Sequence, residues 1–267
     1  MRVALIQMTS TDDVASNLDA ARRWVSAAVE SGAEFVGLPE NFAFLRREGK
    51  PIPCAQSLDG EIITAVRELA RQHQVWILAG TCAERIEGND LLYNTSVLIA
   101  PAGNVEAVYR KIHLFDVDLS DSGGGVFAES ATFAPGAEVV VATTEFGSIG
   151  LSVCYDVRFP ELYRQMATRG TLFITVPSAF APQTGKDHWD VLLRARAIEN
   201  QAFVLAPAQC GQHSEDRASY GRSMIVDPWG IVLAQGNDEP GLVVADCDID
   251  QLERIRANLP ALQHRRL

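Results

Sequence analysis

The sequence predicts an α/β protein in which helices cover β-sheets. Short apolar runs rich in β-forming residues alternate with helical patterns and with turn signals typical of hairpins, so both kinds of element are expected in layers. No linker, repeat or low-complexity segment divides the 267 residues, and we predict a single domain over residues 1–267. The runs that predict strands, about a dozen by this pattern, are 3–6, 35–38, 75–79, 96–100, 105–109, 139–143, 149–154, 172–176, 203–206, 224–226, 231–234 and 242–245.

Helical patterns with recognisable ends follow several of these runs. The first ends at Gly32, and the second covers residues 62–69. A third is predicted to begin at Pro160 and to end at Gly170, because proline suits the first turn of a helix and glycine the residue after its last turn. A fourth, over residues 187–201, has apolar residues around much of its circumference, which predicts burial on more than one side. The turn sequences that predict hairpins are 101–104, 145–147 and 227–230.

Composition excludes several classes of function. The 34 acidic residues outnumber the 23 basic ones, and the net charge of −11 repels phosphate backbones and anionic membranes, so neither is expected as a partner. The five cysteines form no Cys-x-x-Cys pair and no histidine stands at zinc-finger spacing from them, so no disulfide framework, metal site or cofactor is predicted. Because the N-terminus lacks a signal-peptide pattern and no apolar stretch approaches membrane-spanning length, we expect a soluble cytoplasmic protein.

Three residues at predicted strand ends carry groups suited to amide hydrolysis. Cys154 ends an apolar run, and a polar turn separates it from Pro160, so its thiol can point into a cleft at the sheet edge. Glu40 and Lys111 each follow an apolar strand. Each residue also has a simpler interpretation: Cys154 as a buried core thiol, Glu40 as a turn cap or arginine partner, and Lys111 as a solvated lysine on an edge strand.

Taken together, the three groups are those that amide thiolysis needs. A carboxamide is a poor electrophile and ammonia is a poor leaving group. Glu40 would accept the thiol proton of Cys154, give it to the departing ammonia, and then activate water against the thioester. Lys111 and the backbone N–H of Tyr155 would stabilise the tetrahedral oxyanion. The ammonium group of Lys111 is also expected to lower the pKa of the thiol.

Three segments resemble the catalytic motifs of the nitrilase, or carbon-nitrogen hydrolase, superfamily. They are LPENF at 38–42, YRKIHLFD at 109–116 and CYDVRFPELYR at 154–164, and their order and spacing match over nearly the whole chain. The resemblance implies a four-layer α-β-β-α sandwich, symmetric pairing into a dimer, and a Glu-Lys-Cys triad. It also implies that Glu129 is a second glutamate of the cleft, which positions Lys111 and the substrate amide. Glu129 lies in residues 113–130, the longest polar segment without a regular pattern, which predicts a functional or mobile loop.

Further segments indicate the branch of this superfamily. The sequence Cys-Tyr-Asp at 154–156 favours an amidase over a true nitrilase. The ending QHRR at 263–266 leans towards deaminated glutathione as the substrate, which would be cleaved to 2-oxoglutarate and Cys-Gly. The segments that look like the branch containing deaminated glutathione amidase and omega-amidase are 178–180, 184–189, 194–199 and 219–224.

A pocket for 2-oxo acids that bear a distal amide needs groups that bind carboxylates. We predict Arg158, Thr184 and Lys186 for this role, and Tyr155 as the fourth substrate-binding residue. Arg158 paired with Glu161 and a solvated Lys186 are the alternative interpretations.

Other functions stay open on the sequence alone. Within the enzyme class, the alternatives are an omega-amidase acting on 2-oxoglutaramate, another aliphatic amidase, and a nitrilase. A catalytically silent binding module would fit an altered triad, but Glu40, Lys111 and Cys154 are all present. A redox thiol protein would use Cys154, for which no resolving cysteine stands nearby. The predicted partners are a small amide substrate and a second copy of the chain, as a homodimer or higher homo-oligomer.

Overall fold

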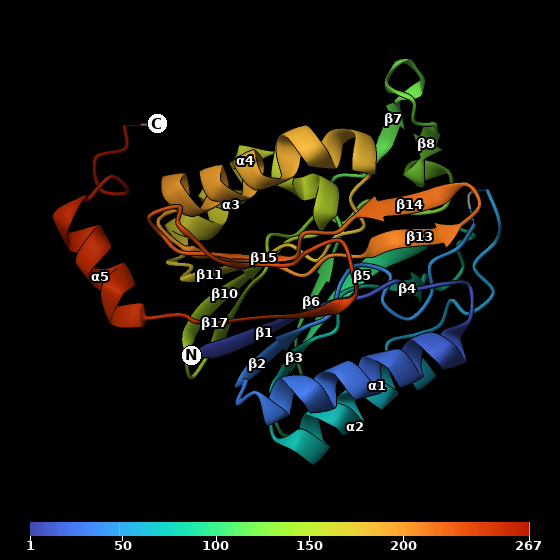
Figure 1. Ribbon diagram of the computed structural model, residues 1–267, viewed down its shortest axis with the longest axis horizontal. Helices are drawn as coiled ribbons and strands as arrows, with labels where there is room; N and C mark the ends of the chain where they lie inside the picture. The colour runs from blue at the N-terminus through green and yellow to red at the C-terminus, as the bar shows by residue number, and fades with distance from the viewer. Residues whose placement is uncertain (48, 267) are drawn as a thin grey trace.

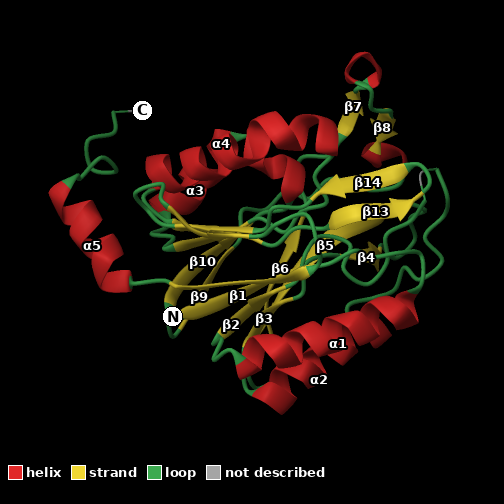
Figure 2. Ribbon diagram, viewed as in Figure 1, coloured by secondary structure: helices red, strands yellow, loops and turns green. Residues whose placement is uncertain are grey.

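Four layers of secondary structure make up the protein, which a computed structural model describes over residues 1–47 and 49–266. Two β-sheets pack face to face, and a pair of helices covers the outer face of each (Figures 1 and 2). This is the α-β-β-α sandwich that the resemblance implied, and the predicted fold class is confirmed. The covering helices are α1 (Val14–Glu30) and α2 (Glu61–His73) on one sheet, and α3 (Pro160–Thr168) and α4 (Pro182–Asn200) on the other.

Each sheet mixes parallel and antiparallel pairs. The first contains β1 (Arg2–Gln7), β2 (Phe35–Gly37), β3 (Trp76–Leu78), β4 (Cys82–Arg85), β5 (Leu92–Ile99), β6 (Val105–Arg110) and β17 (Gly241–Asp246). Its order is β17-β1-β2-β3-β5-β4, with β6 paired to β5. The second contains β9 (Val141–Thr144), β10 (Gly147–Leu151), β11 (Phe173–Thr175), β12 (Phe203–Ala206), β15 (Met224–Val226) and β16 (Val232–Gln235). Its order is β16-β15-β12-β11-β10-β9.

Two short ribbons stand apart from the sheets, at the same end of the sandwich (Figure 1). One pairs β7 (Asp116–Asp118) with β8 (Val126–Ala128), and the other pairs β13 (Cys210–Ser214) with β14 (Arg217–Tyr220). Helix α5 (Ile249–Asn258) follows β17 at the opposite end of the molecule. No helix in the described residues has both the length and the apolar character needed to cross a membrane.

Alternation along the central strands produces the layers. In β1, Val3 and Leu5 belong to the core between the two sheets, whereas Ala4 and Ile6 belong to the core beneath α1 and α2. All four side chains are fully buried. Successive side chains of a strand point to opposite faces of the sheet, so a strand covered on both faces is apolar at every position. This explains the near-continuous apolar runs of the sequence.

The structure differs from the sequence prediction in its polar segments. Residues 113–130 are not an irregular loop, because they contain the β7–β8 ribbon. Asp116 and Asp118 are exposed on that ribbon, so its strands carry no apolar signal. Helix α4 begins at Pro182 and not at residue 187, with the proline in its first turn. The β13–β14 ribbon was likewise too polar for its strands to be predicted.

Candidate active site

Glu40 lies just beyond β2, in a turn held by close packing. Gly80 contacts this turn so tightly that a Cβ at that position would lie 1.8 Å from the carbonyl oxygen of Pro39, and only glycine fits. Gln209 donates a hydrogen bond from Nε2 to the carbonyl oxygen of Glu40 at 3.0 Å. Glu40 is only 3% exposed. The carboxylate of Glu40 also accepts a hydrogen bond from the N–H of Ala179 at 2.8 Å, so its position is fixed from both sheets.

Cys154 lies in a strained turn after β10. Its φ of +48° is in the left-handed region, which costs a residue other than glycine about 1–3 kcal/mol. The N–H of Cys154 donates to the carbonyl oxygen of Pro177 at 3.0 Å, which holds the turn in place. A short 3-10 helix begins at Cys154 and runs to Arg158, so the N–H of Tyr155 lies in its first turn. The thiol therefore stands beyond the end of β10, where it lines a cleft.

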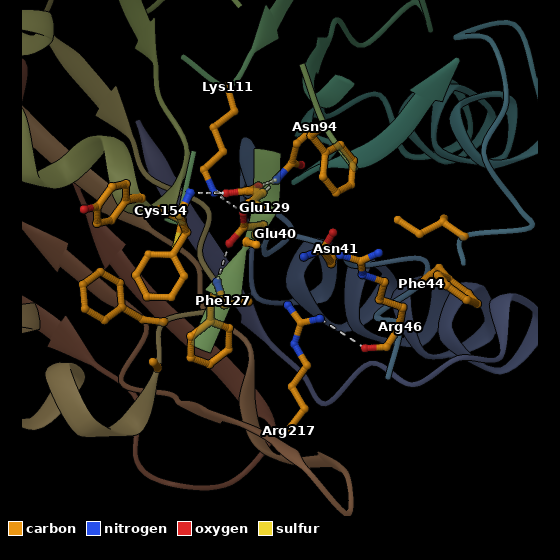
Figure 3. A pocket seen from close by; sticks show the side chains of 18 of the residues that line it. Glu40, Asn41, Phe44, Arg46, Asn94, Lys111, Phe127, Glu129, Cys154 and Arg217 are labelled. Carbon is orange, nitrogen blue, oxygen red and sulfur yellow. Dashed lines mark hydrogen bonds and ion pairs between the residues drawn. The ribbon is translucent and has the colours of Figure 1, made fainter. Parts of the chain in front are cut away.

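Lys111 follows β6 and ends between two carboxylates. Its Nζ donates to Oε1 of Glu40 at 3.1 Å and to Oε2 and Oε1 of Glu129 at 2.8 and 3.0 Å. Asn94 on β5 donates from Nδ2 to Oε1 of both glutamates, at 3.0 Å each. Figure 3 shows these groups gathered at the tip of Lys111, with Cys154 beside them. The acid, the amine and the thiol thus meet in one place, although they are far apart in the sequence.

Burial and charge set the protonation of this cluster. Burial alone would lower the pKa of Lys111, but the negative charges of Glu129 and Glu40 outweigh it and hold the pKa well above its ordinary value. The pKa of the Cys154 thiol is raised well above its ordinary value, first by burial and then by the charge of Glu40, and the ammonium of Lys111 offsets only part of this. The ammonium of Lys111 does lower the thiol pKa, as expected, but burial and the charge of Glu40 outweigh this effect. Two carboxylates surround one ammonium group, so the thiol is protonated at rest.

The cluster opens into a cleft lined by both polar and apolar side chains, as is usual for small-molecule sites. Six of the eight residues predicted from the sequence line this cleft: Glu40, Lys111, Glu129, Cys154, Tyr155 and Thr184. The structure does not bring the other two into the lining. Arg158 packs its guanidinium over the rings of Tyr155 and Phe180, at 5.7 and 5.2 Å from their centroids. Lys186 is exposed and lies 3.9 Å from Asp187.

Comparison with known proteins identifies the family of this chain. Residues 2–257 match the family model described as carbon-nitrogen hydrolase. The chain belongs to the carbon-nitrogen hydrolase family. A Synechocystis protein named deaminated glutathione amidase is 46% identical over 265 residues, which cover 98% of this chain and 97% of that protein.

A human protein of the same name is 44% identical to this carbon-nitrogen hydrolase, over 99% of this chain and 82% of the human protein. Among solved structures, the Caenorhabditis elegans NitFhit protein matches with a TM-score of 0.90 and 38% identity. That match covers 99% of this chain, which spans 65% of NitFhit. The enzyme class predicted from the sequence, a hydrolase of non-peptide carbon-nitrogen bonds, is therefore confirmed.

Two residues that position this site in the hydrolase were missed by sequence reasoning. Asn94 bridges the two glutamates. The only feature that could have indicated this role is its position on β5, the strand that pairs with β6. Asp156 is fully buried, and its Oδ2 accepts hydrogen bonds from the Tyr109 hydroxyl at 2.7 Å and from the Val153 N–H at 2.8 Å. Its Oδ1 lies 3.1 Å from the backbone N and 2.7 Å from the ring Nδ1 of His113. Asp156 thereby joins the turn of the thiol to the segment that carries the amine.

Proposed function

We propose that this carbon-nitrogen hydrolase is an amidase that cleaves deaminated glutathione to 2-oxoglutarate and Cys-Gly. The observation that carries the proposal is the ammonium group of Lys111, held between Glu40 and Glu129 in the cleft that Cys154 also lines. The names of the Synechocystis and human relatives support the substrate, since both match over nearly all of this chain. An omega-amidase acting on 2-oxoglutaramate is the related alternative, because both substrates are 2-oxo acids with a distal amide.

The first half of the proposed reaction forms a thioester. The sulfur of Cys154 attacks the amide carbon while Glu40, which is hydrogen-bonded to the thiol, takes its proton. Negative charge moves to the carbonyl oxygen, where Lys111 and the N–H of Tyr155 stabilise it. The carbon-nitrogen bond then breaks as Glu40 gives its proton to the leaving amine. Glu129 holds Lys111 in position and contributes to the binding of the substrate amide.

The second half of the reaction hydrolyses the thioester. Glu40 takes a proton from water, the resulting hydroxide attacks the acyl carbon, and the bond from that carbon to the sulfur of Cys154 breaks. Glu40 returns its proton to the sulfur of Cys154, and the product acid loses its remaining proton to solvent and leaves as a carboxylate. Because Glu40 is unprotonated at the start of each half, the same carboxylate can serve both as base and as acid. No external reductant or oxidant is needed, and the residues of the cluster supply every other proton acceptor and charge that the steps use.

Substitution of the nucleophile tests this mechanism. The wild type and Cys154→Ala are assayed separately with deaminated glutathione, by release of Cys-Gly, and with 2-oxoglutaramate and butyronitrile, by release of ammonia. We expect the wild type to prefer deaminated glutathione and Cys154→Ala to lose at least about 10⁴-fold in kcat. Cys54→Ala is the matched control, because Cys54 is a partly exposed thiol outside the cleft lining. Undiminished release by Cys154→Ala, or a preference for the nitrile, would contradict the proposal.

We also propose that the protein works as a homodimer in the cytoplasm, with residues 1–267 as one hydrolase domain. Val191 and Ile198 are exposed on α4, at 66% and 49%, and Trp229 and Ile231 are exposed at 56% and 53%. Large apolar side chains exposed in this way favour a protein partner, and the symmetric pairing implied by the family motifs makes a second copy the candidate. The five cysteines are free thiols, which fits a reducing compartment. Sedimentation of Val191→Glu tests the dimer, and an unchanged sedimentation coefficient would contradict pairing through this face.

A further inference from the structure

Two arginines from distant segments line the same cleft as the catalytic cluster. Arg46 follows the Glu40 turn, and Arg217 begins β14, 171 residues later. Nη1 of Arg217 donates to the carbonyl oxygen of Arg46 at 3.2 Å, and Nη1 of Arg46 donates to Oγ1 of Thr132 at 2.9 Å. Both side chains are partly buried, and both point into the cleft in Figure 3. Their guanidinium groups are therefore held at defined positions in its wall.

The cleft is divided by charge. Around the thiol, Glu40 and Glu129 outnumber Lys111, and this part of the cleft carries net negative charge. Lys111 and Arg217 enter from opposite sides in Figure 3, so the positive charge of the arginines is separate from the cluster. The apolar side chains that also line the cleft include those of Phe44, Ile52, Phe127, Phe133 and Phe180. A ligand with a neutral amide at one end, an apolar spacer and an anion at the other end matches this lining.

We infer that Arg46 and Arg217 bind a substrate carboxylate that lies away from the amide to be cleaved. Guanidinium groups pair with carboxylates through parallel charge-assisted hydrogen bonds, and two of them can hold one carboxylate in a single orientation. This inference rests on the proposed amidase function and names the residues that select its substrate. The carboxylate can belong to the acyl part, as the 2-oxo acid group does, or to the leaving group, as the carboxyl end of Cys-Gly does. Arg158, which was predicted for this role, packs outside the lining instead.

Kinetics with three amides tests the inference and separates the two sources of the carboxylate. In 2-oxoglutaramate the carboxylate is in the acyl part, in N-butanoyl-Cys-Gly it is in the leaving group, and butyramide has none. For Arg46→Gln and Arg217→Gln we expect kcat/KM to fall about 10- to 100-fold with at least one anionic amide, chiefly through KM. We expect butyramide to be cleaved by the variants as by the wild type. Equal losses with all three amides, or no loss with either anionic amide, would overturn the inference.

Two further variants guard against effects on folding. Arg47→Gln is the matched control, because Arg47 neighbours Arg46 in the chain but pairs with Asp12 at 3.1 Å on the surface, outside the lining. It should leave all three rates unchanged. Arg217→Lys keeps the charge but loses the guanidinium fork, and we expect it to retain part of the affinity that Arg217→Gln loses. If Arg217→Gln does not fold, a fully active Arg217→Lys with an unchanged KM for both anionic amides would overturn the inference.

A binding measurement separates failure of this inference from failure of the proposed function. Glutarate, a dicarboxylate without an amide, is titrated calorimetrically into Cys154→Ala and into Cys154→Ala combined with Arg217→Gln. We expect the second variant to bind it about 10- to 100-fold more weakly. If the second variant binds glutarate more weakly but the wild type cleaves none of the amides, the arginine site is supported and the proposed amidase function is refuted. If the two variants bind glutarate with equal affinity but the wild type cleaves the amides, the amidase function is supported and the arginine site is refuted.

Discussion

Replacing Asp156 by asparagine is expected to weaken the hydrogen bonds that connect the turn of Cys154 to the segment of Lys111. Each oxygen of the buried carboxylate has two partners: Tyr109 and Val153 on Oδ2, and the backbone and ring nitrogens of His113 on Oδ1. An amide of the same shape keeps one acceptor oxygen and turns its NH₂ group towards two donors. Two hydrogen bonds to a charged group are then lost, at about 1.5–3 kcal/mol each, so unfolding free energy should fall by about 3–6 kcal/mol.

Thermal unfolding and kinetics together test this value for Asp156→Asn. A loss of about 3–6 kcal/mol lowers the Tm of a protein of this size by about 6–24 °C. The decrease in kcat should exceed any change in KM, because the cluster loses its geometry and not its substrate contacts. Asp19→Asn is the control, since Asp19 forms only an exposed pair with Arg22 in α1 and should matter by less than about 1 kcal/mol. A Tm for Asp156→Asn within about 2 °C of the wild type, which is roughly the measurement error, would refute the reasoning.

Three further predictions concern other buried groups. Asn94→Ala removes the amide that bridges Glu40 and Glu129. In steady-state assays we expect kcat to fall about 10- to 100-fold with little change in KM. An unchanged kcat would contradict this role of Asn94. Burial lowers the pKa of His213 to about 4. The pKa of this histidine is higher in the unfolded chain, about 6.5, so between the two pKa values the unfolded state binds a proton that the folded state does not. The contribution of His213 to the unfolding free energy is therefore full above about pH 6.5 and is lost as the pH falls towards 4. Unfolding free energy should drop by about 2 kcal/mol between pH 7 and pH 5 in denaturant titrations, and His213→Asn should reduce that slope. The pKa of the Cys154 thiol is raised, mainly by burial, so the thiol is protonated at neutral pH. Its alkylation by iodoacetamide should therefore accelerate as pH rises from 7 to 9. A rate independent of pH would contradict a protonated resting thiol.

The sequence predicted most strongly those features that have a local cause. The central strands are apolar at every position because both faces of the sheets are covered, so a short window of sequence suffices to find them. Helix ends at Pro160 and Gly32 follow from backbone preferences of single residues. Glu40, Lys111 and Cys154 could be named because each ends a strand within a recognisable motif. Their convergence came from the resemblance to a family, and the local pattern alone left the simpler interpretations open.

The features that were missed depend on contacts between distant segments. Arg46 and Arg217 are separated by 171 residues and share one wall of the cleft, and nothing near either residue in the sequence indicates the other. Arg158 looked like the better carboxylate ligand because it stands four positions after the nucleophile, but the 3-10 turn places it against aromatic rings. Asn94 lies in the middle of β5, where a polar side chain has no periodic signal to distinguish a site residue from a strand residue.

The charge of the buried cluster links the proposed chemistry to the proposed substrate. Glu40 and Glu129 already place two carboxylates beside the single ammonium of Lys111, so a resting thiolate at Cys154 would add uncompensated charge in a site shielded from water. The thiol proton therefore leaves only as the sulfur–carbon bond forms, when the new negative charge moves onto the substrate oxygen. An anionic substrate faces the same repulsion on entering the cleft. Cationic groups away from the cluster are thus needed to admit it, and the two arginines of the cleft wall supply them.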